Sequence, residues 1–102
     1  MGVIKYVNKI TTATAVEIVD INTRTQELNS MTIANVHTAD ATVQVYLKDS
    51  SAVAVDYYII KDAVIPVGGS LKLEKDELDF DTTLYNLYVK LGGSTPVDVI
   101  VR

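Results

Sequence analysis

The strict alternation of apolar and polar side chains along residues 42–48 constrains the fold more than any other feature of the chain. Successive side chains of a β-strand point to opposite faces. A period of two over these seven residues therefore predicts a strand with one face on a core. The aliphatic face carries Val43, Val45 and Leu47, and the opposite face carries Gln44, Tyr46 and Lys48.

The composition favours the same conformation throughout the chain. Val, Ile and Thr together supply 35 of the 102 residues, and six tyrosines join them. Side chains that are aromatic or branched at Cβ fit the pleated surface of a sheet, whereas they lose rotamer freedom in a helix. Ala, Glu and Leu form no long window with a helical period. The chain is therefore expected to be all-β.

Strand-like patterns recur in eight segments. Residues 55–61 are apolar on both faces from Tyr57 to Ile60, as a central strand covered on two sides would be. Their short separation from residues 42–48 predicts a hairpin. The eight segments are residues 3–10, 15–21, 31–35, 42–48, 55–61, 70–75, 84–91 and 96–102.

Turn residues separate these segments. Pro66 has no N–H for a strand ladder, and Gly68 and Gly69 tolerate positive φ. This step should therefore end one strand and redirect the backbone. Residues 11–14 are either a turn or a continued strand, and the acidic residues 75–83 are either a loop or a single helical turn.

Short strands at a spacing of about ten residues are typical of β-sandwiches and small barrels. A length of 102 residues fits one compact domain, and no internal repeat or linker divides the chain. We therefore expect residues 1–102 to form a single-domain antiparallel β-sandwich, Ig-like or jelly-roll-like, with about six to eight short strands.

Charge and composition exclude several classes of partner. The net charge is −4 and the nine basic residues are scattered, whereas nucleic-acid binders cluster Lys and Arg against phosphates. No apolar run approaches the roughly 20 residues that span a bilayer, and the alternating start lacks the apolar region of a signal peptide. The lack of cysteine excludes disulfides and thiol nucleophiles. We expect neither nucleic acid nor membrane as a partner.

The sequence carries no complete catalytic constellation. His37 is the single histidine, and it lacks the second histidine or the serine elbow that a metal or nucleophilic site requires. We expect it to be a strand-end or loop residue. The glycine pairs at residues 68–69 and 92–93 lack the lysine and the spacing of a phosphate loop. The chain is therefore expected to be no enzyme and to use no cofactor or metal.

A group of acidic residues near residue 80 leaves one alternative open. Clustered carboxylates can supply several of the about six to eight oxygens that calcium prefers, yet the glycine and the final glutamate of a calcium loop are missing. A solvated loop is the favoured interpretation, and a cation site is the other. The residues concerned are Asp76, Glu77, Asp79 and Asp81.

The chain holds more apolar material than a small domain can hide. Hydrophobic residues make up 48% of it and the mean hydropathy is +0.20, while small domains bury a smaller share of their surface. Tyrosine is favoured at interfaces, although the same rings fit cross-strand pairs or a second core layer equally well. The candidate partner-binding residues are Tyr46, Tyr58, Tyr88, Ile60 and Ile100, and the candidate edges for pairing with neighbouring subunits are residues 3–10 and 97–102.

Four motifs follow one another in the middle of the chain: TIAN (32–35), TVQVYL (42–47), YYIIKD (57–62) and VIPVGGSLKL (64–73). They resemble small virion proteins of tailed bacteriophages, which share an I-x-N strand, a T-V-x-V-Y-L strand, an aromatic–aliphatic strand and an I-P-x-G-x-S/T-L-x-L corner. The resemblance covers under half of the chain, and its motifs are structural rather than catalytic.

The resemblance implies a non-enzymatic structural protein of the virion, assembled in the host cytoplasm. Such a protein is a capsid decoration or cement protein, or an accessory of the head, neck or tail. Its partners would be major capsid, neck or tail subunits, contacted as a homo-oligomer or in many copies on a symmetric assembly. Repetition of this kind lets weak individual contacts hold through multivalency.

Two other classes of function stay open. A carbohydrate- or receptor-binding β-sandwich would use exposed aromatic platforms, but the chain has no Trp and a single Phe. A small enzyme or metal-dependent regulator is the more distant alternative, because the residues for such chemistry do not form a set.

Overall fold

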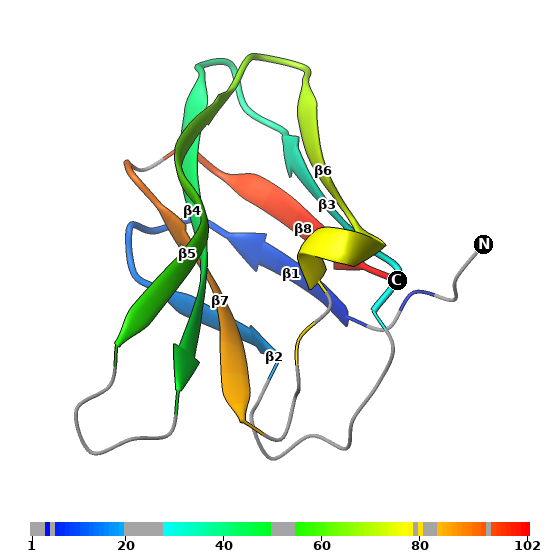
Figure 1. The fold of residues 1–102 in the computed structure, drawn as a ribbon. Helices are drawn as coiled ribbons and strands as arrows, with labels where there is room; N and C mark the ends of the chain where they lie inside the picture. The colour runs from blue at the N-terminus through cyan, green and yellow to red at the C-terminus, as the bar shows by residue number, and fades with distance from the viewer. Residues whose placement is uncertain are drawn as a thin grey trace.

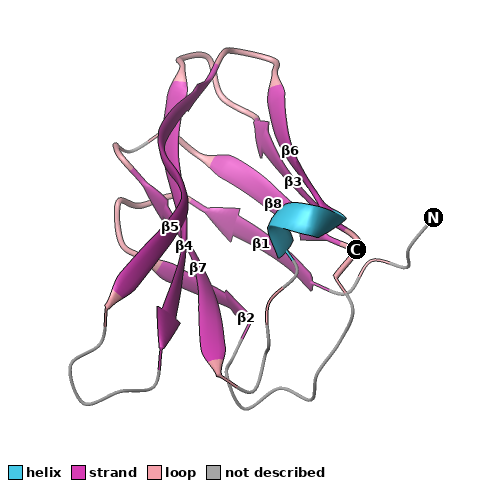
Figure 2. Ribbon diagram, viewed as in Figure 1, coloured by secondary structure: helices cyan, strands magenta, loops and turns pink. Residues whose placement is uncertain are grey.

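A computed structural model of the chain describes residues 4, 6–19, 28–49, 55–78, 80, 84–93 and 95–102. It contains eight strands and one short 3₁₀ helix (Figures 1 and 2). The strands are β1 (Tyr6–Ile10), β2 (Val16–Val19), β3 (Ser30–Asn35), β4 (Ala41–Asp49), β5 (Asp56–Ile65), β6 (Ser70–Glu74), β7 (Tyr85–Leu91) and β8 (Val97–Val101), and the helix is η1 (Lys75–Leu78). None of the helical residues described forms a segment long and apolar enough to cross a bilayer.

The strands form two four-stranded antiparallel sheets that pack against each other, which confirms the predicted β-sandwich (Figure 1). The first sheet has the order β1-β8-β3-β6, and the second has the order β2-β7-β4-β5. The pairs β4 with β5, β3 with β6, β2 with β7 and β1 with β8 are all antiparallel neighbours. The chain is thus one long antiparallel hairpin, folded at the β4–β5 connection and rolled into two layers.

This strand order selects the jelly roll from the two sandwiches that the sequence allowed. In an immunoglobulin fold the last two strands are neighbours in one sheet. Here β7 lies in the second sheet and β8 in the first. An eight-stranded double sheet built in this way is a jelly roll.

The core lies between the inward faces of the two sheets, and the alternation seen in the sequence supplies it. Val43 and Val45 of β4 are fully buried, and Leu47 packs against the same cluster. In β8, alternate valines are also buried. The buried apolar residues are Ile10, Ile18, Val19, Leu28, Met31, Ile33, Ala41, Val43, Val45, Ile65, Leu73, Leu78, Leu87, Val89, Leu91, Val97, Val99 and Val101.

Two predicted strand positions are wrong. Residues 55–61 do not form a strand covered on both sides, because β5 is the edge of the second sheet and leaves Tyr57 and Tyr58 exposed. The C-terminal segment 97–102 is not an edge either, since β8 lies between β1 and β3. The N-terminal strand β1 is an edge of the first sheet, as predicted.

The connections resolve two alternatives left by the sequence. Residues 11–15 form no strand and contain the bend that separates β1 from β2, and the acidic segment contains the single helical turn η1.

The step between β5 and β6 is a β-turn that carries the chain from the second sheet to the first. The Gly69 N–H donates to the Pro66 carbonyl at 2.9 Å, and Gly68 has a φ of 74°. In this turn from Pro66 to Gly69, the third residue, Gly68, has the positive φ that a type II turn requires there and that glycine adopts without strain. The prediction that this step redirects the backbone is confirmed.

Replacement of Gly68 by alanine should therefore destabilise the protein, because an L side chain at positive φ costs about 1–2 kcal/mol. Gly93→Ala is the matched control, since Gly93 has open space around its Cα and no positive φ. Its free energy of unfolding should change by less than about 0.5 kcal/mol. Urea unfolding of both variants tests this. Equal losses of stability would contradict the role given to Gly68.

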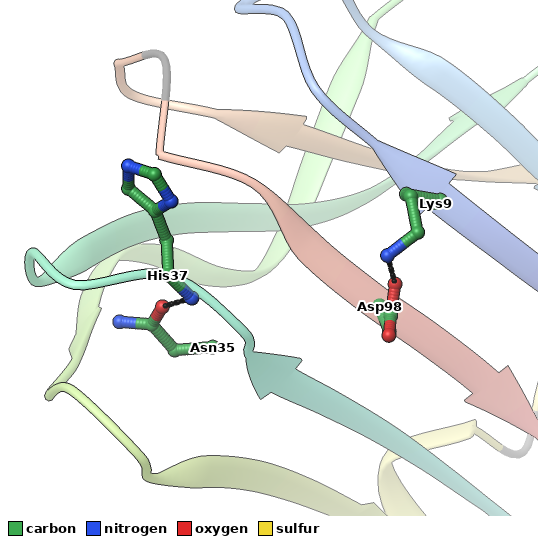
Figure 3. A network of polar contacts seen from close by, with 4 residues as sticks. All are labelled: Lys9, Asn35, His37 and Asp98. Atoms are coloured by element: carbon green, nitrogen blue, oxygen red, sulfur yellow. Dashed lines mark hydrogen bonds and ion pairs between the residues drawn. The ribbon is translucent and has the colours of Figure 1, made fainter.

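Asn35, at the end of β3, is the one polar residue buried with the core among the described residues, at 5% exposure. Its side-chain amide donates to the carbonyls of Ala39 and Ile65 at 2.8 and 3.0 Å. Its side-chain oxygen accepts the His37 backbone N–H at 2.9 Å (Figure 3). The amide thus joins the end of β3, the β3–β4 connection and the end of β5.

Removal of this amide in Asn35→Ala should lower the free energy of unfolding by about 2–3 kcal/mol, because it leaves one N–H and two carbonyls without their partner. Gln44→Ala, which removes one exposed side-chain hydrogen bond to Asp62, should cost about 0.5 kcal/mol or less. Chemical denaturation measures the free energy of unfolding of both variants, and the comparison holds when its dependence on denaturant concentration is the same in both. A cost for Asn35→Ala no larger than that of the control would show that these bonds do not hold the corner.

Candidate interaction surface

Three of the five predicted partner-binding residues meet on the outer face of the second sheet. Tyr46 of β4 lies directly opposite Tyr58 of β5 and Tyr88 of β7 in the strand registers. The ring centroids of Tyr46 and Tyr58 are 5.3 Å apart, and those of Tyr46 and Tyr88 are 5.5 Å apart and nearly parallel. Tyr88, Tyr46 and Tyr58 therefore form a continuous line of rings across three strands, which we call the tyrosine row.

The outward direction of the row follows from the local sequence. In β4, Val45 and Leu47 flank Tyr46 and point into the core, so the alternation of the strand turns Tyr46 outward. The two neighbouring strands place tyrosine at the matching register positions. Aromatic pairs at such distances stabilise a sheet beyond the area that they bury.

The three rings differ in exposure. Tyr46 is only 4% exposed although it points away from the core, because the rings on both sides cover it. Tyr58 is 43% exposed, and Tyr88 is half-buried. The rings are thus the cross-strand pairs that the sequence allowed, and the Tyr58 end of the row remains accessible.

Charged side chains surround the row and restrain its rings. The Lys61 ammonium lies 5.0 Å from the centre of the Tyr58 ring, and the Lys48 ammonium lies 5.4 Å from that of Tyr88. The Tyr88 hydroxyl donates to a Glu17 carboxylate oxygen at 3.0 Å. Two ammonium groups and one carboxylate thus contact the rings, so the surface combines an aromatic centre with a charged rim.

Sequence reasoning missed most of this rim. Glu17 lies on β2, far from Tyr88 along the chain, and it reaches the row only because β2 pairs with β7. A period-two pattern shows which face a side chain occupies, but it does not show which strand is the neighbour. Alternation along residues 42–48 places Lys48 on the face of Tyr46, but no signal in the sequence identifies Glu17 or Lys61 as members of the surface.

The other two candidates, Ile60 and Ile100, lie elsewhere. Alternation along β5 would place Ile60 on the face of Tyr58, but the pairing with β4 shifts between Val45 and Tyr46. The extra residue of this irregularity turns Ile60 towards the core, against which it packs half-buried. Ile100 lies half-buried on the outer face of the first sheet.

The residues considered for metal or acid–base chemistry form no site in the described part of the chain. His37 is exposed in the connection between β3 and β4, as predicted for a loop residue. Asp76 and Glu77 are exposed on η1, whereas Asp79 and Asp81 lie outside the described residues. Among the described residues, no group of three or more His, Asp or Glu side chains could hold a metal ion.

Comparison of the chain with protein-family models, with curated proteins and with solved structures finds no match.

The tyrosine row has a titration that tests its geometry. Burial, followed by the Asp56 carboxylate and the Tyr58 and Tyr88 phenols, raises the pKa of Tyr46 above the ordinary value of 10.0. Because the folded state favours the neutral phenol, the unfolded chain loses this proton first. The contribution to stability is therefore complete below about pH 10 and is lost as the pH rises through the raised pKa.

An alkaline titration monitored by tyrosinate absorbance should accordingly show one phenol that ionises above the ordinary tyrosine pKa, and Tyr46→Phe should remove this ionisation. The same variant should flatten the decline of stability at alkaline pH. Tyr57→Phe is the control, since Tyr57 is 49% exposed and lies outside the row. If this ionisation persists in Tyr46→Phe, that would contradict the burial of this phenol.

Proposed function

We propose that the protein is a non-enzymatic structural subunit that docks onto a larger protein assembly through the tyrosine row. The observation that carries this proposal is the row itself, three rings in contact across three strands, whose accessible end, Tyr58, lies beside the Lys61 ammonium. The four motifs shared with small virion proteins support a specific setting, a tailed-phage virion. There the protein would serve as a capsid decoration or cement protein, or as an accessory of the head, neck or tail.

The chemistry of the surface fits a protein partner. Protein interfaces enrich tyrosine at a centre that becomes dry and place polar groups at the rim. Tyr58 provides a large apolar area with a polar tip, and contacts with Tyr46 and Lys61 already restrain its ring. A side chain that is restrained before binding loses less conformational entropy when a partner covers it.

The size of the surface suits an assembly with many copies. One exposed ring with its rim is a small contact, so a single copy would bind weakly. A symmetric particle offers many equivalent sites. Copies bound at adjacent sites can also contact each other, and these additional contacts strengthen the binding of each copy by multivalency. The partners we propose are therefore repeated capsid, neck or tail subunits.

Binding to assembled particles tests the proposal. Labelled protein should co-sediment saturably with tailed-phage particles assembled in the absence of this chain. Tyr58→Ala should weaken the binding by about tenfold or more, the loss expected for a central aromatic residue. Tyr57→Ala is the matched control, because Tyr57 is exposed to a similar degree on the same strand but lies outside the row.

Melting temperatures of both variants separate binding from folding. The proposal fails if wild-type protein does not bind particles, or if folded Tyr58→Ala binds as well as Tyr57→Ala does.

A carbohydrate- or receptor-binding module is the second candidate, and one observation favours it. On the same face of β4 as Tyr46 and two residues from it, the Gln44 amide donates to the Asp62 carboxylate at 2.8 Å, and Tyr58 is the exposed ring of the row. A sugar can use a ring for stacking and such polar groups for its hydroxyls. Binding on a glycan array that Tyr58→Ala abolishes, together with no binding to particles, would support this function over the structural one.

A further inference from the structure

The two sheets end in four edge strands, and each edge offers backbone groups for pairing with another chain. Three of these edges carry features that oppose such pairing. The pairing of β5 with β4 shifts twice, and Asp62 within it has a positive φ of 57°. β2 has four residues and one register shift. Irregularities of this kind twist an edge away from a straight partner.

The third edge, β6, is regular but carries charge. Lys72 stands at its centre and is exposed. If two copies paired antiparallel about this residue, the two Lys72 side chains would lie directly opposite each other. Like charges in that position are destabilising.

The fourth edge, β1, has no irregularity, and its central residue, Asn8, carries no charge. Its five residues pair with β8 without any shift in register. Val7, on its outer face, is 66% exposed, and Lys9 is neutralised by Asp98, whose carboxylate lies 2.6 Å from the ammonium (Figure 3). A hollow of about 300 Å³ runs along this seam, lined by Val7, Asn8, Lys9, Asp98, Val99 and Ile100.

We infer that β1 is the self-association edge of the protein and pairs antiparallel with β1 of a second copy, about a two-fold axis at Asn8. This register makes the two edges complementary. Val7 lies opposite Lys9 of the second copy, and Tyr6 lies opposite Ile10 of the second copy. The first sheets of the two copies join into one continuous sheet.

The charges on the outer face favour this register. Within one chain, Lys9 is opposite Asp98 and Val7 is opposite Ile100. A line of side chains across the joined sheets therefore runs from Asp98 and Lys9 of one copy to Val7 and Ile100 of the second copy. No such line opposes two like charges. The hollow beside Val7 leaves room for the aliphatic stem of the second copy's Lys9.

Asn8 fixes the centre of the pairing. It is half-buried and points to the inner side of the sheet between Tyr6 and Ile10. Its amide both donates and accepts hydrogen bonds, so two Asn8 side chains can bond to each other at the axis. A five-residue strand pair buries less than a standard interface of about 1,600 Å². The dimer is therefore weak, with a dissociation constant of about 10 µM to 1 mM.

This dimer is independent of the proposed docking function. β1 belongs to the first sheet, and the tyrosine row lies on the outer face of the second. Pairing of two β1 strands leaves both tyrosine rows open. Failure of self-association would leave particle binding untouched, and the reverse also holds.

Sedimentation velocity over a range of concentrations tests the inference. Wild-type protein should show reversible dimerisation. Val7→Lys should raise the dissociation constant by about tenfold, because the new lysine of each copy then lies opposite Lys9 of the other copy. Val7→Glu should associate more tightly than Val7→Lys does, since the new carboxylate of each copy then lies opposite the Lys9 ammonium of the other copy and attracts it. Val64→Lys, at an equally exposed valine on β5, should dimerise like the wild type.

The register has its own test, because the chain contains no cysteine. Directly opposed residues of an antiparallel pair have Cβ atoms close enough for a disulfide. Asn8→Cys should therefore form a disulfide-linked dimer on mild oxidation, whereas Val7→Cys should do so far more slowly. The inference is overturned if the wild type stays monomeric up to millimolar concentration. It is also overturned if Val7→Lys and Val64→Lys dimerise equally, or if both cysteine variants cross-link at the same rate.

Discussion

The structure depends on the packing of two apolar sheet faces against each other. Apart from β4 and β5, consecutive strands lie in different sheets, so the chain crosses repeatedly between the layers. Strand pairing then joins segments from opposite ends of the chain, as between β1 and β8. What draws these segments together is burial of the alternate Val, Ile and Leu side chains of β3, β8, β4 and β7, each worth about 1.5–3 kcal/mol.

Asn35 shows how the molecule accommodates polar groups next to this core. At the corner where β3, β4 and β5 meet, backbone groups leave the regular ladders, and unbonded groups there would be costly. The Asn35 amide bonds three of them, and its own N–H donates to the Gly69 carbonyl at 3.0 Å. The side chain of Asn35 thus ties the β3–β4 connection to the end of β5, and its backbone N–H ties β3 to the β5–β6 turn.

The tyrosine row follows from the same alternation that builds the core. Inward valines and leucines at neighbouring positions oblige the residue between them to point outward, and three strands place tyrosine at matching registers. The result is a surface with an aromatic centre and charged rim on one sheet and an open edge strand on the other. The proposed docking and the inferred self-association therefore use separate parts of the molecule.

The sequence by itself determined much of the local structure. Each of the eight predicted segments overlaps a strand, although β5 continues four residues beyond the predicted end. The inward valines, the turn at Pro66 to Gly69 and the outward direction of Tyr46 were all predicted correctly. These features could be predicted because alternation, proline and glycine act on the few residues around them.

Apart from the β4–β5 hairpin, which the sequence predicted and the structure confirms, only the tertiary structure decided which strands are neighbours. It placed β8 in the middle of a sheet and β5 at an edge, turned Ile60 inward through a shift in register, and brought Glu17 to Tyr88. The jelly-roll order and the meeting of three tyrosines arise in the same way. Each depends on pairing between strands, most of them far apart in the chain, and a period of two leaves that pairing undetermined.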